Sequence, residues 1–339
     1  MKIISIDDRT KWDDYIKSHE EANFLQSWDF YEFYKSRGNK IVRRALVDDN
    51  GKIIAAYAGA VETAKRGKHL AIAGGPIMDW KDTKVVRAIF EDIKEQGNRL
   101  ECVFVRIRPQ LELSDKSLAL MQKLKLKRAP MYLSVEFAGI LDLRKTREEI
   151  LAGASQGFRR KLRKAEKAEI EVTAETDDKA IKEFCALEKK HAVRQKYVAF
   201  STDFLTKQFE AFRNNGEILL YTARKDGEIL AMNFMIFYGP EASYHYGVSS
   251  ELGTKYSAAP LLHMEAMDEA RRRGCVRYNL WGIVEPEEKT HRFYGVSEFK
   301  RSFGCEELKY TPAHDLILKP LIYQKTKLVE SVRKKVRHV

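Results

Sequence analysis

The chain has 339 residues, of which 44% are apolar and 32% charged, and its formal net charge at pH 7 is +12. This length predicts two domains that each bury a core, and the composition excludes fibrous and disordered proteins. No apolar run approaches the roughly 18 residues that a membrane-spanning helix needs, and the N-terminus lacks a signal-peptide pattern, so we expect a soluble cytoplasmic protein. The four cysteines are far apart and unpatterned, which predicts reduced thiols, no metal and no cofactor.

The first half of the chain contains a predicted β-hairpin. Apolar residues alternate from Val42 to Tyr57 on both sides of Asn50-Gly51, a dipeptide typical of two-residue hairpin turns. A glycine-containing strand follows at Leu70 to Pro76. Apolar residues at helical spacing then predict a helix from Thr83 to Gln96, and a buried strand follows from Cys102 to Pro109.

The second half repeats this order of elements. Its hairpin turns at Asp226-Gly227, and the later elements are a strand at Ser243 to Ser249, a helix at Ala259 to Arg273 and a strand at Val276 to Gly282. The two turn glycines are 227 − 51 = 176 residues apart. This offset predicts two copies of one α/β unit, each a mixed, largely antiparallel sheet flanked by helices. GxGxxG and GxxxxGK[ST] are absent, which argues against dinucleotide-binding and P-loop proteins.

The boundary between the two copies is expected near Leu141 to Arg144, just before a predicted helix from Thr146 to Ala152. We therefore expect one domain over residues 1–143 and a second over residues 144–339.

The positive charge is concentrated in two segments of the expected second domain. A predicted helix within residues 155–170 carries six cations against two acids, and residues 319–339 hold seven lysines or arginines against Glu330 alone. Basic clusters attract the phosphates of RNA, of a pyrophosphate or of anionic lipid. A solvated helix face is the alternative interpretation for each.

A further segment combines glycines, aromatic residues and cations in a way that a hydrophobic core does not require. It comprises Trp281-Gly-Ile and, after a charged loop, the residues from Phe293 to Gly304. This composition indicates a substrate-binding edge.

An ordered set of motifs over nearly the whole length resembles the Fem family of peptidoglycan bridge-forming aminoacyltransferases. The motifs are Phe24-Leu-Gln-Ser-Trp-Asp-Phe, Gly74-Gly-Pro-Ile-Met-Asp, Arg160-Lys-Leu-Arg-Lys-Ala-Glu-Lys, Tyr244-His-Tyr-Gly-Val-Ser, Trp281-Gly-Ile and Phe299-Lys-Arg-Ser-Phe-Gly. The resemblance implies two tandem GNAT-like domains. Some relatives carry a long helical arm in the second domain, and the run from Ile181 to Arg213 is too short for one, so the chain resembles the armless kind.

The resemblance implies transfer of an amino acid from aminoacyl-tRNA to an amine on the stem peptide of a peptidoglycan precursor. An aminoacyl ester is already activated, so a neutral amine attacks it directly, without a covalent enzyme intermediate. Positioning and charge stabilisation then supply most of the rate. This agrees with the lack of a Ser-His-Asp or Cys-His arrangement in the sequence.

The resemblance also implies site residues. Lys300 matches the family's catalytic lysine, where an ammonium stabilises the oxyanion or the leaving ribose oxygen, and an exposed strand face is the alternative. Phe299 is expected to stack on the terminal adenine or to join the core, and Arg301 to contact phosphate. Tyr244 and Tyr246 match two tyrosines that contact the precursor, and in a regular strand both face the same side, although strand packing explains them equally.

Two further positions match phosphate-binding residues of the family only in approximate register. Arg194 lies near the arginine that binds the pyrophosphate, with Lys196 as its rival, and Lys35 stands one position beyond the family's lysine. Arg108 replaces an aspartate proposed as a base in some relatives. An arginine cannot accept the amine's proton, so water, the substrate or Glu285 would accept it, and Arg108 would instead pair with an acidic group of the precursor.

The two basic segments also have expected partners. A helix with Arg159, Arg160, Lys161, Arg163 and Lys164 is expected to follow the phosphates of a tRNA acceptor stem. The C-terminal segment is expected to form a basic amphipathic helix that lies on anionic lipid at the inner face of the cell membrane or packs on the second domain. We expect a monomer. The competing functions are a GNAT-type N-acyltransferase that uses acyl-CoA, although Ser155-Gln-Gly-Phe-Arg is not its pyrophosphate loop, and a non-catalytic RNA-binding module.

Overall fold

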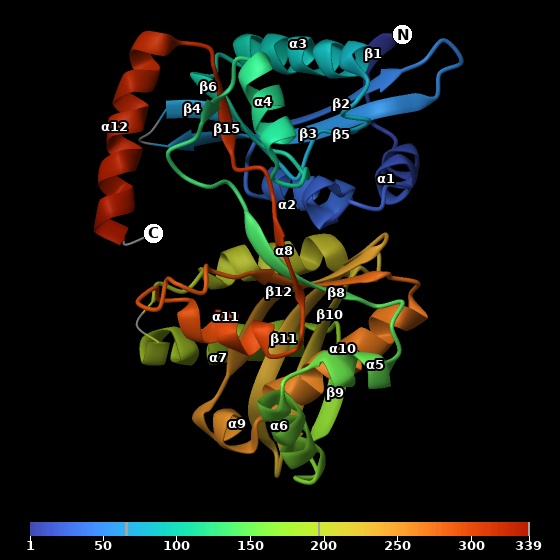
Figure 1. The fold of residues 1–339 in the computed structure, drawn as a ribbon, viewed down its shortest axis with the longest axis vertical. Coiled ribbons are helices and arrows are strands. Elements are labelled where there is room, and N and C mark those ends of the chain that lie inside the picture. The colour runs from blue at the N-terminus through green and yellow to red at the C-terminus, as the bar shows by residue number, and fades with distance from the viewer. Residues whose placement is uncertain (65–66, 196, 338–339) are drawn as a thin grey trace. The chain divides into compact units, whose positions relative to one another are not determined.

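The computed structural model describes residues 1–64, 67–195 and 197–337, with side chains through Glu330 at the C-terminal end. It divides into two compact units. One consists of Met1–Phe137 together with Leu308–Val339, and the other of Ala138–Glu307. Each unit is α/β, with a mixed sheet and flanking helices (Figure 1).

The first unit is built on a sheet with the strand order β1-β2-β3-β4-β6-β15-β7, and β5 pairs with β3. Its strands are β1 (Lys2–Ser5), β2 (Ile41–Val47), β3 (Ile53–Ala64), β4 (Gly67–Ala73), β5 (Ile77–Met78), β6 (Phe104–Arg108), β7 (Lys127–Arg128) and β15 (His314–Ile317). Its α-helices are α1 (Arg9–Lys17), α2 (Trp28–Ser36), α3 (Thr83–Arg99), α4 (Asp115–Lys123) and α12 (Pro320–Arg337), with a 3-10 turn at Phe24–Gln26.

Helix α3 shows why the first unit folds on this sheet. Asp82 caps its N-terminus by accepting hydrogen bonds from the backbone amides of residues 84 and 85. Val85, Ile89 and Ile93 recur every four residues and are buried against the sheet. The helical spacing in the sequence predicted this helix, which continues to Arg99.

The second unit has the strand order β14-β8-β13-β12-β11-β10-β9. The strands are β8 (Phe137–Asp142), β9 (Glu171–Glu175), β10 (Ile218–Lys225), β11 (Glu228–Tyr238), β12 (Glu241–Ser249), β13 (Arg277–Gly282) and β14 (Glu306–Lys309). The helices are α5 (Arg147–Gly153), α6 (Gln156–Glu166), α7 (Asp178–Gln195), α8 (Thr202–Arg213), α9 (Glu251–Tyr256), α10 (Ala258–Arg272) and α11 (Tyr294–Arg301). Aromatic contacts of Phe234 with Phe184 and Phe209 place α7 and α8 on one face of the sheet.

The duplication inferred from the sequence is present in both units. The hairpin β2–β3, strand β4, helix α3 and strand β6 correspond in order to β10–β11, β12, α10 and β13. In each copy the strand before the helix runs parallel to the strand after it. The predicted fold class is therefore confirmed.

The division into domains differs from the expected boundary because the two units exchange a strand. After β6 the chain forms α4 and β7 of the first unit and then β8, which pairs antiparallel with β13 of the second sheet. The corresponding place beside β6 is taken by β15, which arrives from the C-terminal end. In Figure 1, β15 and α12, in red, lie among the elements of the first unit. The expected second domain of residues 144–339 is corrected accordingly.

The C-terminal helix consequently belongs to the first unit, whereas one of the two expectations had it pack on the second domain. An ion pair between Arg106 and Glu330 holds α12 on the first unit. None of the described helices is both long and apolar enough to cross a membrane.

Candidate active site

In the second unit, the two parallel strands at the centre of the sheet separate after a short paired stretch. β12 pairs with β13 only from Glu241 to Ser243, opposite Arg277 to Asn279. The corresponding strands of the first unit, β4 and β6, stay paired over His69–Ala73. Where strands part, backbone groups and side chains of both edges become available to a ligand. The separation marks this end of the second sheet as the candidate site.

A buried carboxylate joins the two strands just before they separate. Glu241 is 1% exposed and accepts hydrogen bonds from the Ser243 hydroxyl at 2.7 Å and the Asn279 amide at 3.1 Å. Its other oxygen pairs with Arg277 at 3.0 Å. Asn279 in turn accepts a hydrogen bond of 2.8 Å from the backbone N–H of Trp281. This network fixes the point of separation.

Both strands carry an irregularity beyond that point. In β13 the register against β8 shifts between Asn279 and Gly282, and Trp281 has a φ of 66°, a conformation unfavourable for a bulky residue. Strain of this kind is found at functional sites more often than elsewhere. The Trp281-Gly-Ile motif therefore forms a bent strand end.

In β12 the register against β11 shifts so that Tyr244 lies opposite Met235 and Tyr246 opposite Phe234. Adjacent residues of β11 point to opposite faces, so the bulge places the two tyrosines on opposite faces. Tyr244 contacts His263 of α10 with a ring-centroid distance of 4.4 Å, whereas Tyr246 contacts Phe234 on the α7–α8 face. The expectation that both tyrosines face the same side was wrong.

Lys300 lies on helix α11 and is only 6% exposed, so the alternative of an exposed strand face was wrong. Its Nζ donates a hydrogen bond of 2.7 Å to the carbonyl oxygen of Gly282, at the end of β13. Its ammonium also lies 5.6 Å from the centre of the Tyr244 ring. Within the described part of the chain no carboxylate pairs with it. Burial lowers the pKa of this ammonium from its ordinary value of 10.5 to about 7.

Two ionisable neighbours of Lys300, His263 and Cys305, are uncharged at neutral pH. His263 is fully buried, its Nδ1 lies 2.8 Å from the Tyr278 hydroxyl, and burial lowers its pKa to about 3. At neutral pH this imidazole is uncharged. The Cys305 thiol contacts the Lys300 carbonyl oxygen, and burial raises its pKa to about 11, so the thiol stays protonated and is a poor nucleophile.

Helix α7 also carries a buried carboxyl group. Glu188 of α7 is 7% exposed, and its Oε2 accepts a hydrogen bond of 2.8 Å from the Tyr197 hydroxyl. Burial raises the pKa of this carboxyl above its ordinary value, although the Tyr197 hydrogen bond acts in the opposite direction. Burial, and to a lesser extent the negative charge of Glu188, raises the pKa of the Tyr244 hydroxyl. Sequence reasoning did not select Glu188 or Tyr197.

Near Glu188, Arg194 donates a hydrogen bond to the backbone carbonyl of Ser249, where β12 ends, and lies 3.0 Å from His191 Nδ1. Arg194 therefore contacts the end of β12 that follows Tyr246. Its rival Lys196 lies outside the described residues.

Phe299 and Arg301 flank Lys300 in different ways. The Phe299 ring packs against His263 and Phe303, on the core of the second unit, which favours the core alternative for this residue. Arg301 pairs with Glu307 at 2.6 Å and Glu298 at 3.2 Å. A phosphate at Arg301 would compete with two carboxylates.

Helix α6 lies against the C-terminal end of α11. The Phe158 and Phe303 ring centroids are 4.3 Å apart, and the Ser155 amide donates to the Ser302 carbonyl at 2.9 Å. The basic helix is therefore a direct neighbour of the helix that carries Lys300.

The predicted cations of α6 divide into two groups. Arg159 donates three hydrogen bonds to carbonyls at the end of α5, and Lys164 Nζ donates to the Lys255 carbonyl at 2.6 Å. Arg160, Lys161 and Arg163 are exposed. The first pair has structural contacts, and the second group forms the open basic surface.

Comparison with known protein families gives one match in each half of the chain. Residues 8–122 match the FemAB family, and residues 152–301 match the acetyltransferase (GNAT) domain. The FemAB match thus lies in the first half of the chain and the acetyltransferase match in the second. No curated protein matches it.

Solved structures share the fold of this chain. The crystal structure of FemX has a TM-score of 0.88 and 19% identity, over 96% of this chain and 100% of FemX. The C-terminal domain of a putative lysylphosphatidylglycerol synthetase from Agrobacterium fabrum has a TM-score of 0.57 and 15% identity, over 94% and 95%. A tandem GNAT protein from the clavulanic acid biosynthesis pathway has a TM-score of 0.56 and 13% identity, over 93% and 99%. The matched families make this protein a transferase of the acyltransferase type.

The first unit, which contains the residues that match the FemAB family, holds the other two predicted site residues. Lys35 is an exposed residue of α2, and its nearest carboxylate is Glu32 at 3.7 Å. Arg108, at the end of β6, is 1% exposed and donates hydrogen bonds of 2.6 Å to Ser134 and to Gln110. Arg108 thus connects the segments that follow β6. Of these two residues, Lys35 is the one whose side chain is exposed.

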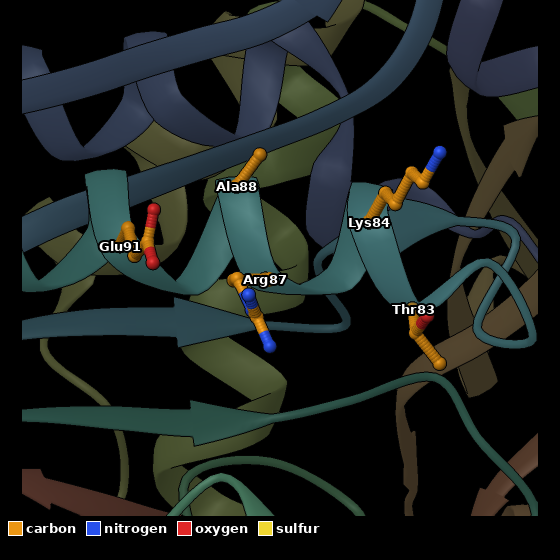
Figure 2. Close-up of a pocket in the computed structure, with 5 residues that line it drawn as sticks. All are labelled: Thr83, Lys84, Arg87, Ala88 and Glu91. Carbon is orange, nitrogen blue, oxygen red and sulfur yellow. The ribbon is translucent and has the colours of Figure 1, made fainter.

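Two surface hollows lie away from all these residues. One, of about 250 Å³, runs along α3, where Thr83, Lys84, Arg87, Ala88 and Glu91 line it (Figure 2). The other, of about 320 Å³, lies between α10 and strands β9 and β10, and Glu269 and Arg273 are among its lining residues. Neither contains a predicted site residue.

Proposed function

We propose that this protein is a non-ribosomal aminoacyltransferase that moves an amino acid from aminoacyl-tRNA to the stem-peptide amine of a peptidoglycan precursor. The observation that carries the proposal is the buried Lys300 ammonium, fixed at the open end of β13 by its hydrogen bond to Gly282. A preorganised cation in a dry environment stabilises negative charge far better than one in water.

The proposed reaction forms one bond and breaks one. The amine nitrogen attacks the ester carbonyl carbon, and the oxyanion develops beside the Lys300 ammonium. As the intermediate collapses, the bond from carbon to the ribose oxygen breaks, and Lys300 protonates that oxygen. A pKa of about 7 suits this step, because a buried lysine that is still protonated at neutral pH is a stronger acid than an exposed one.

Glu188 is proposed to take the proton that the amine loses. Its Oε2 is held by Tyr197, and its other oxygen makes no hydrogen bond to any described residue. A carboxyl group with a raised pKa is closer to the operating pH and therefore a better base than an ordinary glutamate. Tyr244 lies beside Lys300, whose ammonium is 5.6 Å from the centre of its ring. In this proposal Glu188 is the proton acceptor, a role that Arg108 cannot fill.

The basic surface of α6 supports tRNA as the donor, since Arg160, Lys161 and Arg163 are exposed on a helix that packs directly on α11. Backbone phosphates are bound by such a surface without reading sequence. In this proposal the first unit holds the precursor, with Lys35 as its phosphate contact. The fold of this chain also occurs in the C-terminal domain of a putative lysylphosphatidylglycerol synthetase.

The direct test supplies the purified chain with charged tRNA and either a UDP-linked or a lipid-linked precursor. Mass spectrometry should detect a new amide on the stem peptide that requires both substrates. Acyl-CoA in place of tRNA tests the competing GNAT-type reaction, which the match of residues 152–301 keeps as the second candidate. Acyl transfer from CoA without any transfer from tRNA would reject the proposal. Binding of tRNA with no transfer under varied amino acids would favour the RNA-binding module.

A further inference from the structure

Helix α12 buries polar side chains and exposes apolar ones. Tyr323, Thr326 and Glu330 are 4%, 2% and 1% exposed, whereas Leu321 and Leu328 are 88% and 68% exposed. A surface helix normally turns its apolar stripe toward the core. The reversed arrangement needs a physical cause and a partner for the outer face.

The cause lies in the buried contacts of the inner face. Glu330 accepts hydrogen bonds from Arg106 at 2.8 and 3.0 Å, and the Tyr323 hydroxyl donates to Asp315 at 2.7 Å. The Tyr323 ring also packs on Phe104 with a centroid distance of 5.5 Å. These contacts, one turn after another, fix the rotation of α12 about its axis. Leu321 and Leu328 are therefore on the outer face of the helix. Figure 1 shows α12 along the side of the first unit.

The outer face has a regular pattern. Leu321, Lys325 and Leu328 follow one another at helical spacing, and the exposed side chains of Ile322 and Val329 widen the apolar stripe. Lysines 319, 325 and 327 are exposed along the same helix or at its start. Beyond the described side chains, the sequence repeats the pattern with valines at 332 and 336 and cations at 333, 334, 335 and 337.

We propose that this outer face of α12 binds the surface of an anionic lipid bilayer. Aliphatic side chains on a basic helix enter the headgroup region while lysines and arginines meet the lipid phosphates. A second copy of the chain fits worse, because two such faces would bring their cations together. RNA would match the cations but not the exposed leucines. The single acid of the segment, Glu330, is already neutralised by Arg106 and does not weaken the positive field.

Vesicle flotation of the full-length protein tests this inference. One set of vesicles contains equal parts of phosphatidylglycerol and phosphatidylcholine, and the other contains phosphatidylcholine alone. The protein should bind the anionic set at least about tenfold more tightly, and high salt should remove most of the difference. Leu321→Ser combined with Leu328→Ser, and separately Lys325→Glu, should each weaken binding by about tenfold.

Matched controls separate the face from general surface effects. Leu252→Ser on α9 also replaces an exposed leucine, and Lys123→Glu on α4 also reverses an exposed lysine, and both should bind like the wild type. All variants should keep the wild-type thermal midpoint, because none of the changed side chains is buried. Equal binding to both vesicle sets would overturn the inference. So would a solution dimer that the double leucine variant converts to monomers without any vesicle binding. Transfer to a soluble UDP-linked acceptor is unaffected in either case, so the test is independent of the proposed reaction.

Discussion

Arg106 and Asp315 lie 209 residues apart in the sequence and are joined by two hydrogen bonds of 2.8 Å inside the first unit. Glu330 binds the same guanidinium, so one arginine serves two carboxylates, all three about 1% exposed or less. This cluster attaches the exchanged strand β15 and the helix α12 to the first sheet. It is the point at which the C-terminal segment is most firmly held.

Arg106→Met should therefore lower the free energy of unfolding by about 3–5 kcal/mol, because it leaves two buried carboxylates without a counter-charge. Urea denaturation measures the loss. The triple change Arg106→Met, Asp315→Leu and Glu330→Gln should cost less than the single one, since it removes the uncompensated charges as well. Arg128→Met, on an exposed strand, serves as the control. A loss below about 1 kcal/mol for Arg106→Met would show that water reaches the cluster.

Lys300→Met should abolish transfer and at the same time stabilise the fold by on the order of 2 kcal/mol at neutral pH. The pKa of Lys300 is about 7 in the folded protein against an ordinary 10.5, so the folded state gives up a proton that the unfolded state keeps. The loss of folding stability caused by the buried lysine is thus complete below pH 7 and disappears above about pH 10.5.

Thermal or urea unfolding across this range should show the advantage of Lys300→Met shrinking steadily as the pH rises from 7. Lys94→Met on α3 replaces an exposed lysine and should show no such trend. An advantage that is constant with pH would mean that packing, and not the buried charge, sets the difference.

Glu188→Gln should reduce kcat by about 10²–10⁴-fold and remove the acidic limb of its pH profile, because an amide cannot accept the amine's proton. Tyr197→Phe is the sharper test. The Tyr197 hydrogen bond lowers the pKa of Glu188, so its removal should move the acidic limb to higher pH while activity at alkaline pH remains. Glu183→Gln, on the same helix but paired with Arg224, should keep the wild-type profile. An unchanged limb in Tyr197→Phe would exclude Glu188 as the base.

The cations of α6 should separate by function. Charge reversal at Arg160 and Arg163 should raise the KM for tRNA by about tenfold or more at low salt and reduce the salt dependence of binding, with little effect on stability. Arg159→Ala should instead lower the thermal stability and leave the KM for tRNA nearly unchanged, because its guanidinium donates hydrogen bonds to three carbonyls at the end of α5. Filter binding and thermal unfolding measure the two effects. If both variants lose tRNA affinity equally, the distinction between structural and open cations fails.

The sequence predicted the repeated hairpins well because a turn glycine with alternating apolar residues is a local signal. The strand exchange could not be predicted in this way, since β15 is short and carries Asp315, and only its buried partner Arg106 explains that charge. The bulge at Tyr244 also escaped prediction, because the register of β12 depends on β11 and not on its own alternation.

In the candidate site, too, local motifs could be predicted from the sequence, whereas features that depend on tertiary contacts could not. Lys300 was found through its motif, but its burial and its hydrogen bond to Gly282 arise from the bent end of β13. Glu188 sits in a helix rich in lysine and glutamate, where one more acid indicates a solvated face. Its burial becomes visible only when Tyr197 folds back onto it.

The strand exchange also determines the order in which the two sheets are completed on the ribosome. β6 has no neighbour on one side until His314–Ile317 is synthesised, which happens after the entire second unit has been synthesised. The second unit can therefore close before the first, the reverse of the usual N-to-C order. A nascent first unit must meanwhile protect an unpaired strand edge. Messages truncated just before codon 314 should consequently yield a folded second unit attached to an aggregation-prone first one.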